Sequence, residues 1–159
     1  IIALAFFPLG VAANGDNATA RQAPAFSLPQ LLQANQVSLS DFRGQVVYLD
    51  FWASWCKPCI TSFPVLDELY RQKRSLGFEV IAINLDQRRD KAHAFIEQHP
   101  VSYTLLYDAQ SSVAMAYGVQ AMPSAFFIDK TGKIRLQHSG FRPGDEKSIA
   151  QVIDRLLAE

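Results

Sequence analysis

Two nearly continuous runs of β-branched and aromatic residues constrain the fold of this chain more than any other feature. They occupy 45–51 (QVVYLDF) and 78–85 (FEVIAINL), and such runs are typical of strands buried on both faces of a sheet. Between them, apolar residues recur at helical spacing over 59–74, and Gly77 then supplies a stop. A helix that joins two buried strands over so short a distance predicts a βαβ unit with a parallel strand pair.

Shorter segments on both sides of this unit are expected to complete the fold. Two turn-separated runs ahead of it, 25–28 and 36–39, should pair as a small antiparallel hairpin. After the second buried strand, the pattern predicts a helix over 90–98, a strand over 102–106 and a helix over 111–117.

The C-terminal part of the chain is expected to add a hairpin and a last helix. Strands over 124–128 and 134–138 flank the turn sequence Asp129-Lys130-Thr131-Gly132, which favours an antiparallel connection. Asp145 is the candidate cap of the last helix. The apolar face of that helix carries Ile149, Val152, Ile153, Leu156 and Leu157. The whole order predicts an α/β domain in which helices cover both sides of one central mixed sheet.

The composition supports a single packed domain. Of the 159 residues, 49% are hydrophobic and 19% are charged, a balance that permits a core and argues against disorder. Fifteen basic residues match fifteen acidic ones, and this zero net charge argues against binding of nucleic acid or of an anionic membrane surface. The two cysteines are too few for a scaffold held together by disulfides.

The first 23 residues differ in character from the rest. Residues 1–13 (IIALAFFPLGVAA) are apolar and uncharged, but a bilayer span takes about 20 residues. They resemble the apolar core of a secretory signal that ends in small residues before Asn14. The basic start of a signal is missing, so a longer uncleaved anchor or a buried N-terminal element are the alternatives. Residues 14–23 are expected to be a linker and 24–159 the domain, and export to the periplasm is the favoured interpretation.

The two cysteines stand in Trp55-Cys56-Lys57-Pro58-Cys59, where the first buried strand gives way to the helix. Cys56 is expected at the helix N-terminus, where unpaired N–H groups and the positive end of the dipole favour a thiolate. Lys57 adds positive charge nearby, and Pro58 is tolerated because its missing N–H would have no helical partner. Cys59, one turn further on, should be more buried and keep its proton longer. This arrangement predicts redox exchange.

Three other interpretations of the cysteine pair are weaker. A structural disulfide that closes a four-residue loop would stabilise by roughly 2 kcal/mol, against about 3 for a loop of about 15 residues. A zinc site would have to recruit His93, His99 or His138, none of which has a second ligand at a useful spacing. Two unrelated buried thiols would not explain the Trp, the Pro and the helix start around them. We therefore expect no metal and no cofactor beyond a redox-active Cys56–Cys59 disulfide.

The residues around the cysteines carry a family resemblance. The segment 50–59 (DFWASWCKPC) resembles the thioredoxin active-site signature nearly position for position. Pro64 is similar to the proline that kinks the active-site helix of thioredoxin, and 119–124 (VQAMPS) resembles the segment that holds the family's cis-proline, here Pro123. The resemblance covers 24–159 and implies a thioredoxin fold with Pro123 opposite the disulfide.

Two further features are similar to a narrower group, the exported bacterial thiol:disulfide interchange proteins of the TlpA, ResA and DsbE type. These features are the lead-in 39–44 (LSDFRG) with its preceding hairpin, and an insert over 86–107 that plain thioredoxin lacks. One position departs from the ResA type, which has a glutamate three residues after the second cysteine, where this chain has Ser62. Asp50 instead matches the buried acid of thioredoxin itself. The departure at Ser62 therefore counts against the haem-maturation subtype more than against thiol–disulfide exchange.

This resemblance implies a reductant of disulfides in exported proteins, in some members during cytochrome c maturation. The expected partners are protein disulfide substrates and an upstream, membrane-bound thiol protein that donates electrons. The protein itself is expected to be a monomer, tethered to the inner membrane if its N-terminus is not cleaved.

The roles of the site residues follow from thiol chemistry. Cys56 is expected to attack a substrate disulfide, and Cys59 to resolve the mixed disulfide. Asp50 lies in an apolar strand, so desolvation should raise its pKa and suit it to accept the Cys59 proton; the alternative is a solvated strand-end Asp. Substrate is expected to bind beside Trp55 and by strand addition along Met122-Pro123.

Two other functions remain open at this point. A peroxidase of the same fold shares the early hairpin, but its cysteine normally follows a Pro-x-x-x-Thr/Ser-x-x pattern that 52–55 (WASW) does not match. A binding module that grips partners beside Pro123 without turnover is the second alternative.

Overall fold

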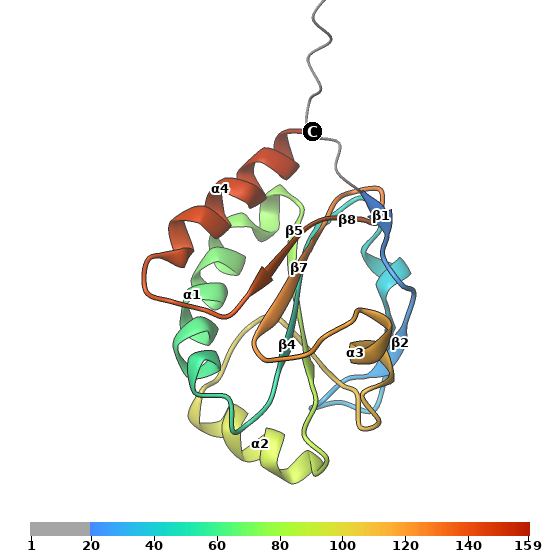
Figure 1. Cartoon of the computed structure of the whole chain (residues 1–159), viewed down its shortest axis with the longest axis vertical. Helices are drawn as coiled ribbons and strands as arrows, with labels where there is room; N and C mark the ends of the chain where they lie inside the picture. Colours follow the sequence, from blue (N-terminus) through green and yellow to red (C-terminus); the bar gives the residue numbers. More distant parts are fainter. Residues whose placement is uncertain (1–19) are drawn as a thin grey trace, which may run out of the picture.

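The computed structural model describes residues 20–159 and has a central sheet with helices packed on both of its faces (Figure 1). The signal or anchor expected over 1–13, and most of the linker expected over 14–23, lie outside the described residues. The elements in chain order are β1 (Arg21–Gln22), β2 (Ser27–Pro29), β3 (Gln36–Ser38), the 3-10 helix η1 (Leu39–Phe42), β4 (Val46–Trp52), α1 (Lys57–Lys73), the 3-10 helix η2 (Arg74–Leu76), β5 (Phe78–Asn84), α2 (Arg89–Gln98), β6 (Thr104–Tyr107), α3 (Ser112–Ala116), β7 (Ser124–Ile128), β8 (Lys133–Ser139) and α4 (Asp145–Ala158).

The central sheet is mixed and has the strand order β1-β8-β7-β4-β5-β6. Strands β4, β5 and β6 run parallel, with Val46 opposite Phe78 and Trp52 opposite Asn84 in the first pair. Strand β7 pairs antiparallel with both β4 and β8. The βαβ unit and the C-terminal hairpin predicted from the sequence are therefore confirmed, and so is the hairpin β2-β3, which forms a second, two-stranded sheet.

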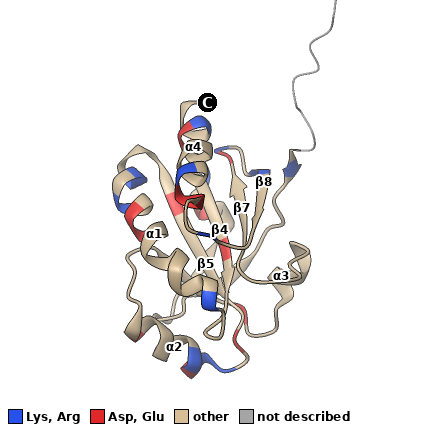
Figure 2. Cartoon of the chain, turned by 60° about the vertical axis from the view of Figure 1, so that its left-hand side comes forward, with Lys and Arg blue, Asp and Glu red and all other residues tan. Residues whose placement is uncertain are grey.

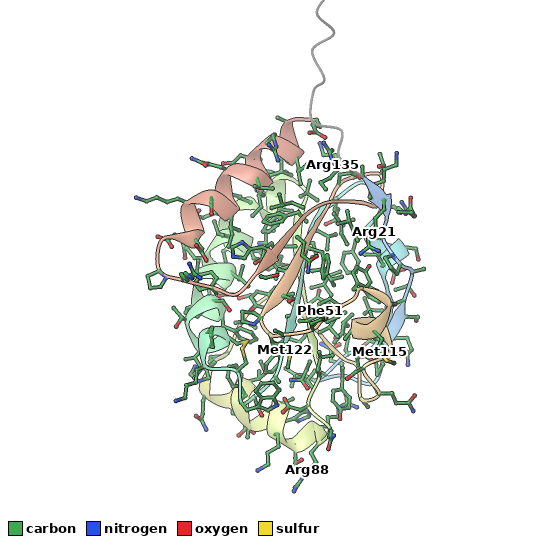
Figure 3. The ribbon with its side chains drawn as sticks, in the orientation of Figure 1. Arg21, Phe51, Arg88, Met115, Met122 and Arg135 are labelled. Atoms are coloured by element: carbon green, nitrogen blue, oxygen red, sulfur yellow. A yellow bond between two sulfur atoms is a disulfide. The ribbon has the colours of Figure 1, made fainter. Side chains whose placement is uncertain are left out.

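All seven residues of β4 are buried, which explains its continuous apolar sequence. Alternate residues of a strand point to opposite faces, and the two faces of β4 belong to different clusters. Val47, Leu49 and Phe51 pack with side chains of α3 and the hairpin β2-β3, and Figure 3 shows Phe51 in the interior. Tyr48 and Trp52 pack with α1, α2 and α4, in the cluster that also contains both cysteines.

The N-terminal boundary of the sheet differs from the expected one. Arg21 and Gln22 were assigned to the polar linker but form β1, an edge strand opposite Ile134 and Lys133 of β8. Ala23, also assigned to the linker, is buried. An edge strand is held by backbone hydrogen bonds, so exposed polar side chains do not prevent it from forming.

The start of α4 also differs from the expectation. The N-cap is Gly144, whose φ of 102° is in the left-handed region that favours glycine. Asp145, the expected cap, is the first helical residue, and its carboxylate accepts a hydrogen bond from the Arg142 N–H at 2.8 Å. Asp145 therefore fixes the turn that leads into the helix.

Charged residues of both signs are intermixed along α1 and α4 (Figure 2). Within residues 20–159, no helix is both long enough and apolar enough to span a bilayer.

Candidate functional site

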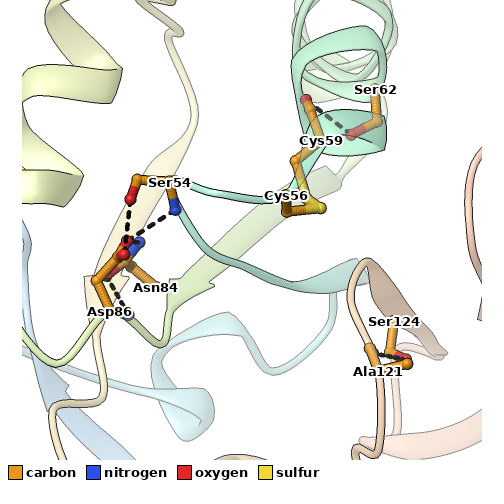
Figure 4. Close-up of a disulfide and its surroundings, with 8 residues drawn as sticks. All are labelled: Ser54, Cys56, Cys59, Ser62, Asn84, Asp86, Ala121 and Ser124. Carbon is orange, nitrogen blue, oxygen red and sulfur yellow. Dashed lines mark hydrogen bonds between the residues drawn. A yellow bond between two sulfur atoms is a disulfide. The ribbon is translucent and has the colours of Figure 1, made fainter.

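The two cysteines form a disulfide at the N-terminus of α1, with their Cα atoms 5.4 Å apart (Figure 4). Cys56 is the N-cap residue, and Cys59 lies in the first turn. Cys59 is more buried than Cys56, as expected, but the difference is small: Cys56 is 3% exposed and Cys59 is fully buried. In the oxidised protein, therefore, the first sulfur is largely covered by its surroundings.

The first turn of α1 has the features that favour a thiolate at its N-cap. Lys57 and Pro58 are the first two helical residues, both are exposed, and the first turn contains no acidic residue. Because Lys57 is exposed, solvent and salt screen its charge. The backbone of the helix start is thus the main local source of positive potential at Cys56.

Asp50 is buried in the centre of β4, with 1% of its surface exposed. Burial raises the pKa of its carboxyl group to about 8, as the apolar strand around it predicts. Its Oδ2 atom has no hydrogen-bond partner among the described residues. Asp50 is two residues from both Tyr48 and Trp52, so its side chain lies on the same face of β4 as theirs. That face belongs to the cluster that contains the cysteines. The alternative of a solvated strand-end Asp is therefore wrong.

The two tryptophans near the site differ in environment. Trp52 is fully buried, and its ring centroid lies 4.9 Å from those of both Phe63 and Phe95. Trp55, directly before Cys56, is 69% exposed. Trp52 is a core residue, whereas Trp55 is a surface residue directly before Cys56.

The bond between Met122 and Pro123 is cis, as the family resemblance implies. Met122 is half-buried and packs against the cluster of α1 and the cysteines, while Pro123 is buried. Hydrogen bonds fix the segment on both sides: the Ser124 hydroxyl donates to the Ala121 carbonyl at 2.7 Å, and the Gly140 N–H donates to the Pro123 carbonyl at 2.8 Å. The structure thus brings Met122, the residue before Pro123, to the same cluster as the disulfide.

Ser62, the position that departs from the ResA type, is buried one turn after Cys59. Its hydroxyl donates to the Cys59 carbonyl at 3.2 Å, a bond within the helix. This position therefore provides no carboxylate beside Cys59.

A second carboxylate close to the active-site loop was not found from the sequence. Asp86 lies just beyond β5 and is 5% exposed. It accepts hydrogen bonds from the Ser54 backbone N–H, the Ser54 hydroxyl and the Asn84 side-chain amide (Figure 4). The polar residues that follow the apolar run of β5 were the only signal in the sequence, and they do not reveal a contact with a loop 32 residues earlier.

The three histidines make separate contacts. Nε2 of His93 lies 2.9 Å from the Leu31 carbonyl oxygen, and Nε2 of His138 lies 3.3 Å from Oδ2 of Asp145. The His99 ring packs against Phe95. Within residues 20–159, no three His, Cys, Asp or Glu side chains are grouped so that they could hold a metal ion.

A disulfide at the start of the helix that follows the central strand, with the Met122 of a cis Met-Pro bond packed against the same cluster, defines the site of a thioredoxin-fold redox protein. Comparison with known proteins then gives the family. The Redoxin family model matches residues 18–153, and the chain belongs to this family. Within the thioredoxin superfamily it is of the TlpA, ResA and DsbE type.

Relatives of known sequence include proteins named thiol-disulfide oxidoreductase ResA. The one from Geobacillus thermodenitrificans is 37% identical over 113 residues, which are 71% of this chain and 64% of that protein. The one from Bacillus subtilis is 33% identical over 112 residues, or 70% of this chain and 62% of that protein. The match thus spans less than two thirds of these relatives.

Solved structures show the same fold. A putative thiol:disulfide interchange protein DsbE from Chlorobium tepidum is 43% identical with a TM-score of 0.84, over 87% of this chain and 96% of that one. A secreted thiol-disulfide isomerase from Corynebacterium glutamicum is 27% identical with a TM-score of 0.80, over 97% and 99% of the two chains. The α/β domain with a central mixed sheet, as predicted from the sequence, therefore has a thioredoxin fold.

Proposed function

We propose that this protein is a thiol:disulfide oxidoreductase that reduces disulfides of exported proteins. The observation that carries the proposal is the Cys56–Cys59 disulfide at the N-terminus of α1. A redox-active pair needs one sulfur that forms a thiolate and a second within bonding distance, and the helix start provides both. The relatives named as oxidoreductases and interchange proteins support this function.

The reaction proceeds by two exchanges at sulfur. In the reduced protein, the Cys56 thiolate attacks one sulfur of a substrate disulfide, and the other substrate sulfur leaves as a thiolate. Cys59, after loss of its proton, attacks the Cys56 sulfur and forms the Cys56–Cys59 bond. The second substrate thiol is then released. The substrate gains two electrons and the protein loses two, so a donor thiol must reduce the disulfide again.

Asp50 accepts the proton that Cys59 must lose. Its pKa of about 8 allows exchange of a proton with a thiol near neutral pH. The absence of a hydrogen-bond partner for Oδ2 among the described residues leaves that atom able to hold the proton.

Substrates bind over the exposed face of Trp55 and along the Met122-Pro123 segment. An extended peptide placed there would pair with backbone groups of Met122 by strand addition. Lys57 and Pro58 modulate the site, because one adds a screened charge and the other shapes the first helical turn.

The compartment and partners form the second part of the proposal. Residues 1–13 belong to a signal or membrane anchor, the linker proposed over 14–23 connects them to the domain, with Arg21 and Gln22 in β1, and the domain acts in the periplasm. It works as a monomer and is reduced by a membrane-bound thiol protein, with cytochrome c maturation as the pathway. The secreted isomerase of the same fold supports an exported location.

An insulin-reduction assay with a dithiol regenerant tests the proposed function. We expect turnover by the wild type and its loss in Cys56→Ser, with Ser62→Ala as a matched control that keeps both cysteines. Peroxide consumption in place of insulin reduction would support a peroxidase. Stable, redox-dependent complexes without either activity would support a binding module.

The reduction potential of the Cys56–Cys59 couple tests the direction of electron flow. A value near that of thioredoxin, about −270 mV, means a reductant, and one near that of DsbA, about −120 mV, means an oxidant. We expect the former, because a moderate thiolate pKa does not strongly favour the dithiol form.

A further inference from the structure

We propose that Asp86 is a positioning residue that holds the loop before Cys56 and so sets where the attacking sulfur stands. The proposal rests on the proposed oxidoreductase function and adds to it a residue outside the Cys-x-x-Cys motif. Asp86 does not touch the sulfur atoms; it acts through Ser54, two residues before Cys56 (Figure 4).

The carboxylate of Asp86 uses both oxygens on the loop. Oδ2 accepts from the Ser54 backbone N–H at 2.8 Å, and Oδ1 accepts from the Ser54 hydroxyl at 2.7 Å. Such a bidentate arrangement fixes both the position and the orientation of Ser54. Since Asp86 is 5% exposed, water does not compete strongly for these bonds.

The sheet holds Asp86 in turn. Asn84, the last residue of β5, is fully buried and donates its side-chain amide to Oδ2 of Asp86 at 2.7 Å. The Asp86 N–H donates back to Oδ1 of Asn84 at 3.0 Å. Asn84 stands opposite Trp52 in the parallel pair. The active-site loop is therefore tied to the carboxyl ends of β4 and β5.

The chain between Ser54, which Asp86 binds, and the sulfur of Cys56 is short. Only Trp55 separates Ser54 from Cys56, and Trp55 is 69% exposed, so it adds little packing of its own. The Cys56 N–H donates to the Ala53 carbonyl at 3.1 Å, which links Cys56 to the same turn. A displacement of Ser54 would thus pass to Cys56, and a reacting atom misplaced by about 1 Å can cost on the order of a hundredfold in rate.

Asp86→Ala and Asp86→Asn separate this role from a general effect on folding. Alanine removes all three hydrogen-bond acceptor contacts. Asparagine can keep them: its oxygen takes the place of Oδ2, and its NH2 group donates to the Ser54 hydroxyl oxygen. The matched control is Asp108→Ala. Asp108 is also buried, at 2% exposure, and accepts hydrogen bonds at the start of α3 from the backbone of Ser112, Val113 and Ala114.

The measurement is the rate at which the reduced protein reacts with glutathione disulfide at about pH 9, above the usual range of helix-start thiols in this motif. At that pH the thiolate is fully formed, so the rate reports the placement of the sulfur. We expect Asp86→Ala to react about tenfold more slowly than wild type, and Asp86→Asn to stay within about threefold of it. Asp108→Ala should match the wild type at 25 °C even if its unfolding midpoint falls. If Asp86→Ala does not fold, Ser54→Ala, which loses only the hydroxyl bond, should slow the reaction about threefold.

The role of Asp86 is overturned if Asp86→Ala reacts at the wild-type rate, if Asp86→Asn is as slow as Asp86→Ala, or if Asp108→Ala is slowed equally. If Ser54→Ala is used instead, a rate equal to that of the wild type also overturns the role of Asp86. A wild type that reduces neither glutathione disulfide nor insulin would instead overturn the proposed function, and the role of Asp86 with it.

Discussion

At the scale of single residues, Asp50 has the most unusual environment in the described chain. An ionised carboxylate in a fully apolar strand would lose its hydration without a compensating hydrogen bond. Burial therefore raises its pKa to about 8, so most of the group holds its proton at neutral pH and only the ionised minority can accept one. The molecule therefore carries a destabilising residue at its centre, which is consistent with a role in catalysis and not in folding.

Asp50 should make the stability of the protein depend on pH. The unfolded carboxyl releases its proton near pH 4 and the native one near pH 8, so the native state binds the extra proton between these values. Stability should accordingly fall as the pH rises from about 4 to about 8. Asp50→Asn should then be more stable than oxidised wild type by up to about 5 kcal/mol at pH 9, with no such gain at pH 4.

Urea unfolding of both oxidised proteins at the two pH values measures this difference. Glu79, whose pKa burial raises to about 7, contributes a pH dependence of the same sign, but it is present in both proteins and cancels in the comparison. A stability difference that does not vary with pH would contradict the buried titration of Asp50.

Asp50 should also control the second step of exchange. Without its carboxylate, Cys59 has to ionise unaided, so Asp50→Asn should resolve mixed disulfides more slowly than wild type near neutral pH, where part of the Asp50 carboxyl is ionised and can accept the proton. At high pH the two proteins should converge, because Cys59 is then ionised without help. Stopped-flow release of the second substrate thiol measures the step; a rate loss of equal size at every pH would assign Asp50 a structural role only.

Lys57 should have only a small effect on the Cys56 thiolate. Its side chain is exposed, so its charge is screened, while Cys56 is the N-cap residue and so stands at the positive end of the dipole of α1. Thiolate absorbance followed against pH in Cys59→Ser should titrate moderately below an ordinary thiol, and Lys57→Ala should raise the midpoint slightly. A large rise in Lys57→Ala would show that the side chain, and not the helix, makes the thiolate.

These single residues differ in how well the sequence predicted them. Cys56, Cys59 and Asp50 lie within ten consecutive residues, so a local motif was enough to single them out. Asp86 contacts Ser54 only because β4 and β5 pair in parallel with Trp52 opposite Asn84. That register depends on the packing of the whole sheet and cannot be obtained from local sequence.

At the scale of elements, hydrogen bonds of side chains and backbone attach the insert to the N-terminal segment, and Arg89 makes several of them. The Arg89 guanidinium at the start of α2 donates to the carbonyl of Gln30 at 2.5 Å and to that of Leu31 at 2.7 and 3.1 Å. Leu31 itself is fully buried. The two features that distinguish this chain from plain thioredoxin, the hairpin and the insert, therefore hold each other in place.

Removal of this attachment should destabilise the fold. Arg89→Ala leaves the carbonyls of Gln30 and Leu31 without their charged donor, at a cost of about 1–3 kcal/mol. The neighbouring Arg88 is the matched control, because it points away from the domain (Figure 3) and, within residues 20–159, pairs only with the exposed Asp90. Arg88→Ala should leave the unfolding midpoint in urea unchanged. Equal losses in the two variants would contradict the proposed attachment.

Element types were predicted more reliably than element boundaries. Periodicity and turn residues identified each α-helix and the main strands, because these signals are local, but not the 3-10 helices η1 and η2. The short edge strand β1 is not predicted, since Arg21 and Gln22 are exposed and are held by backbone pairing with β8 and by a hydrogen bond from the Gln22 side-chain amide to the Gly132 carbonyl. The expected N-cap of α4 is one residue late. Asp is a preferred N-cap residue because of its side chain, but the cap position here has a φ of 102°, which glycine adopts readily, and it is Gly144.

At the scale of the whole molecule, the fold brings the groups of the proposed reaction to one side of the sheet. Strand β4 ends in the active-site loop, α1 begins with the disulfide, and the segment before β7 places Met122 against the same cluster. The neighbouring strand β5 ends next to the loop and provides Asp86. Sequence reasoning identified the motif and its partner segment, and the sheet order then explains why they meet.

The central claim is that Cys56 attacks substrate disulfides and Cys59 releases the product. The most direct test is to trap substrate on single-cysteine variants, with reduced Cys59→Ser and Cys56→Ser each mixed with a disulfide-bonded protein such as insulin. Mixed disulfides are then counted on non-reducing gels and by mass. The account predicts that Cys59→Ser accumulates a mixed disulfide through Cys56, the N-cap residue, whereas Cys56→Ser accumulates none, because its remaining thiol lies inside the first helical turn and is fully buried. Equal trapping by the two variants, or trapping by Cys56→Ser alone, would contradict it.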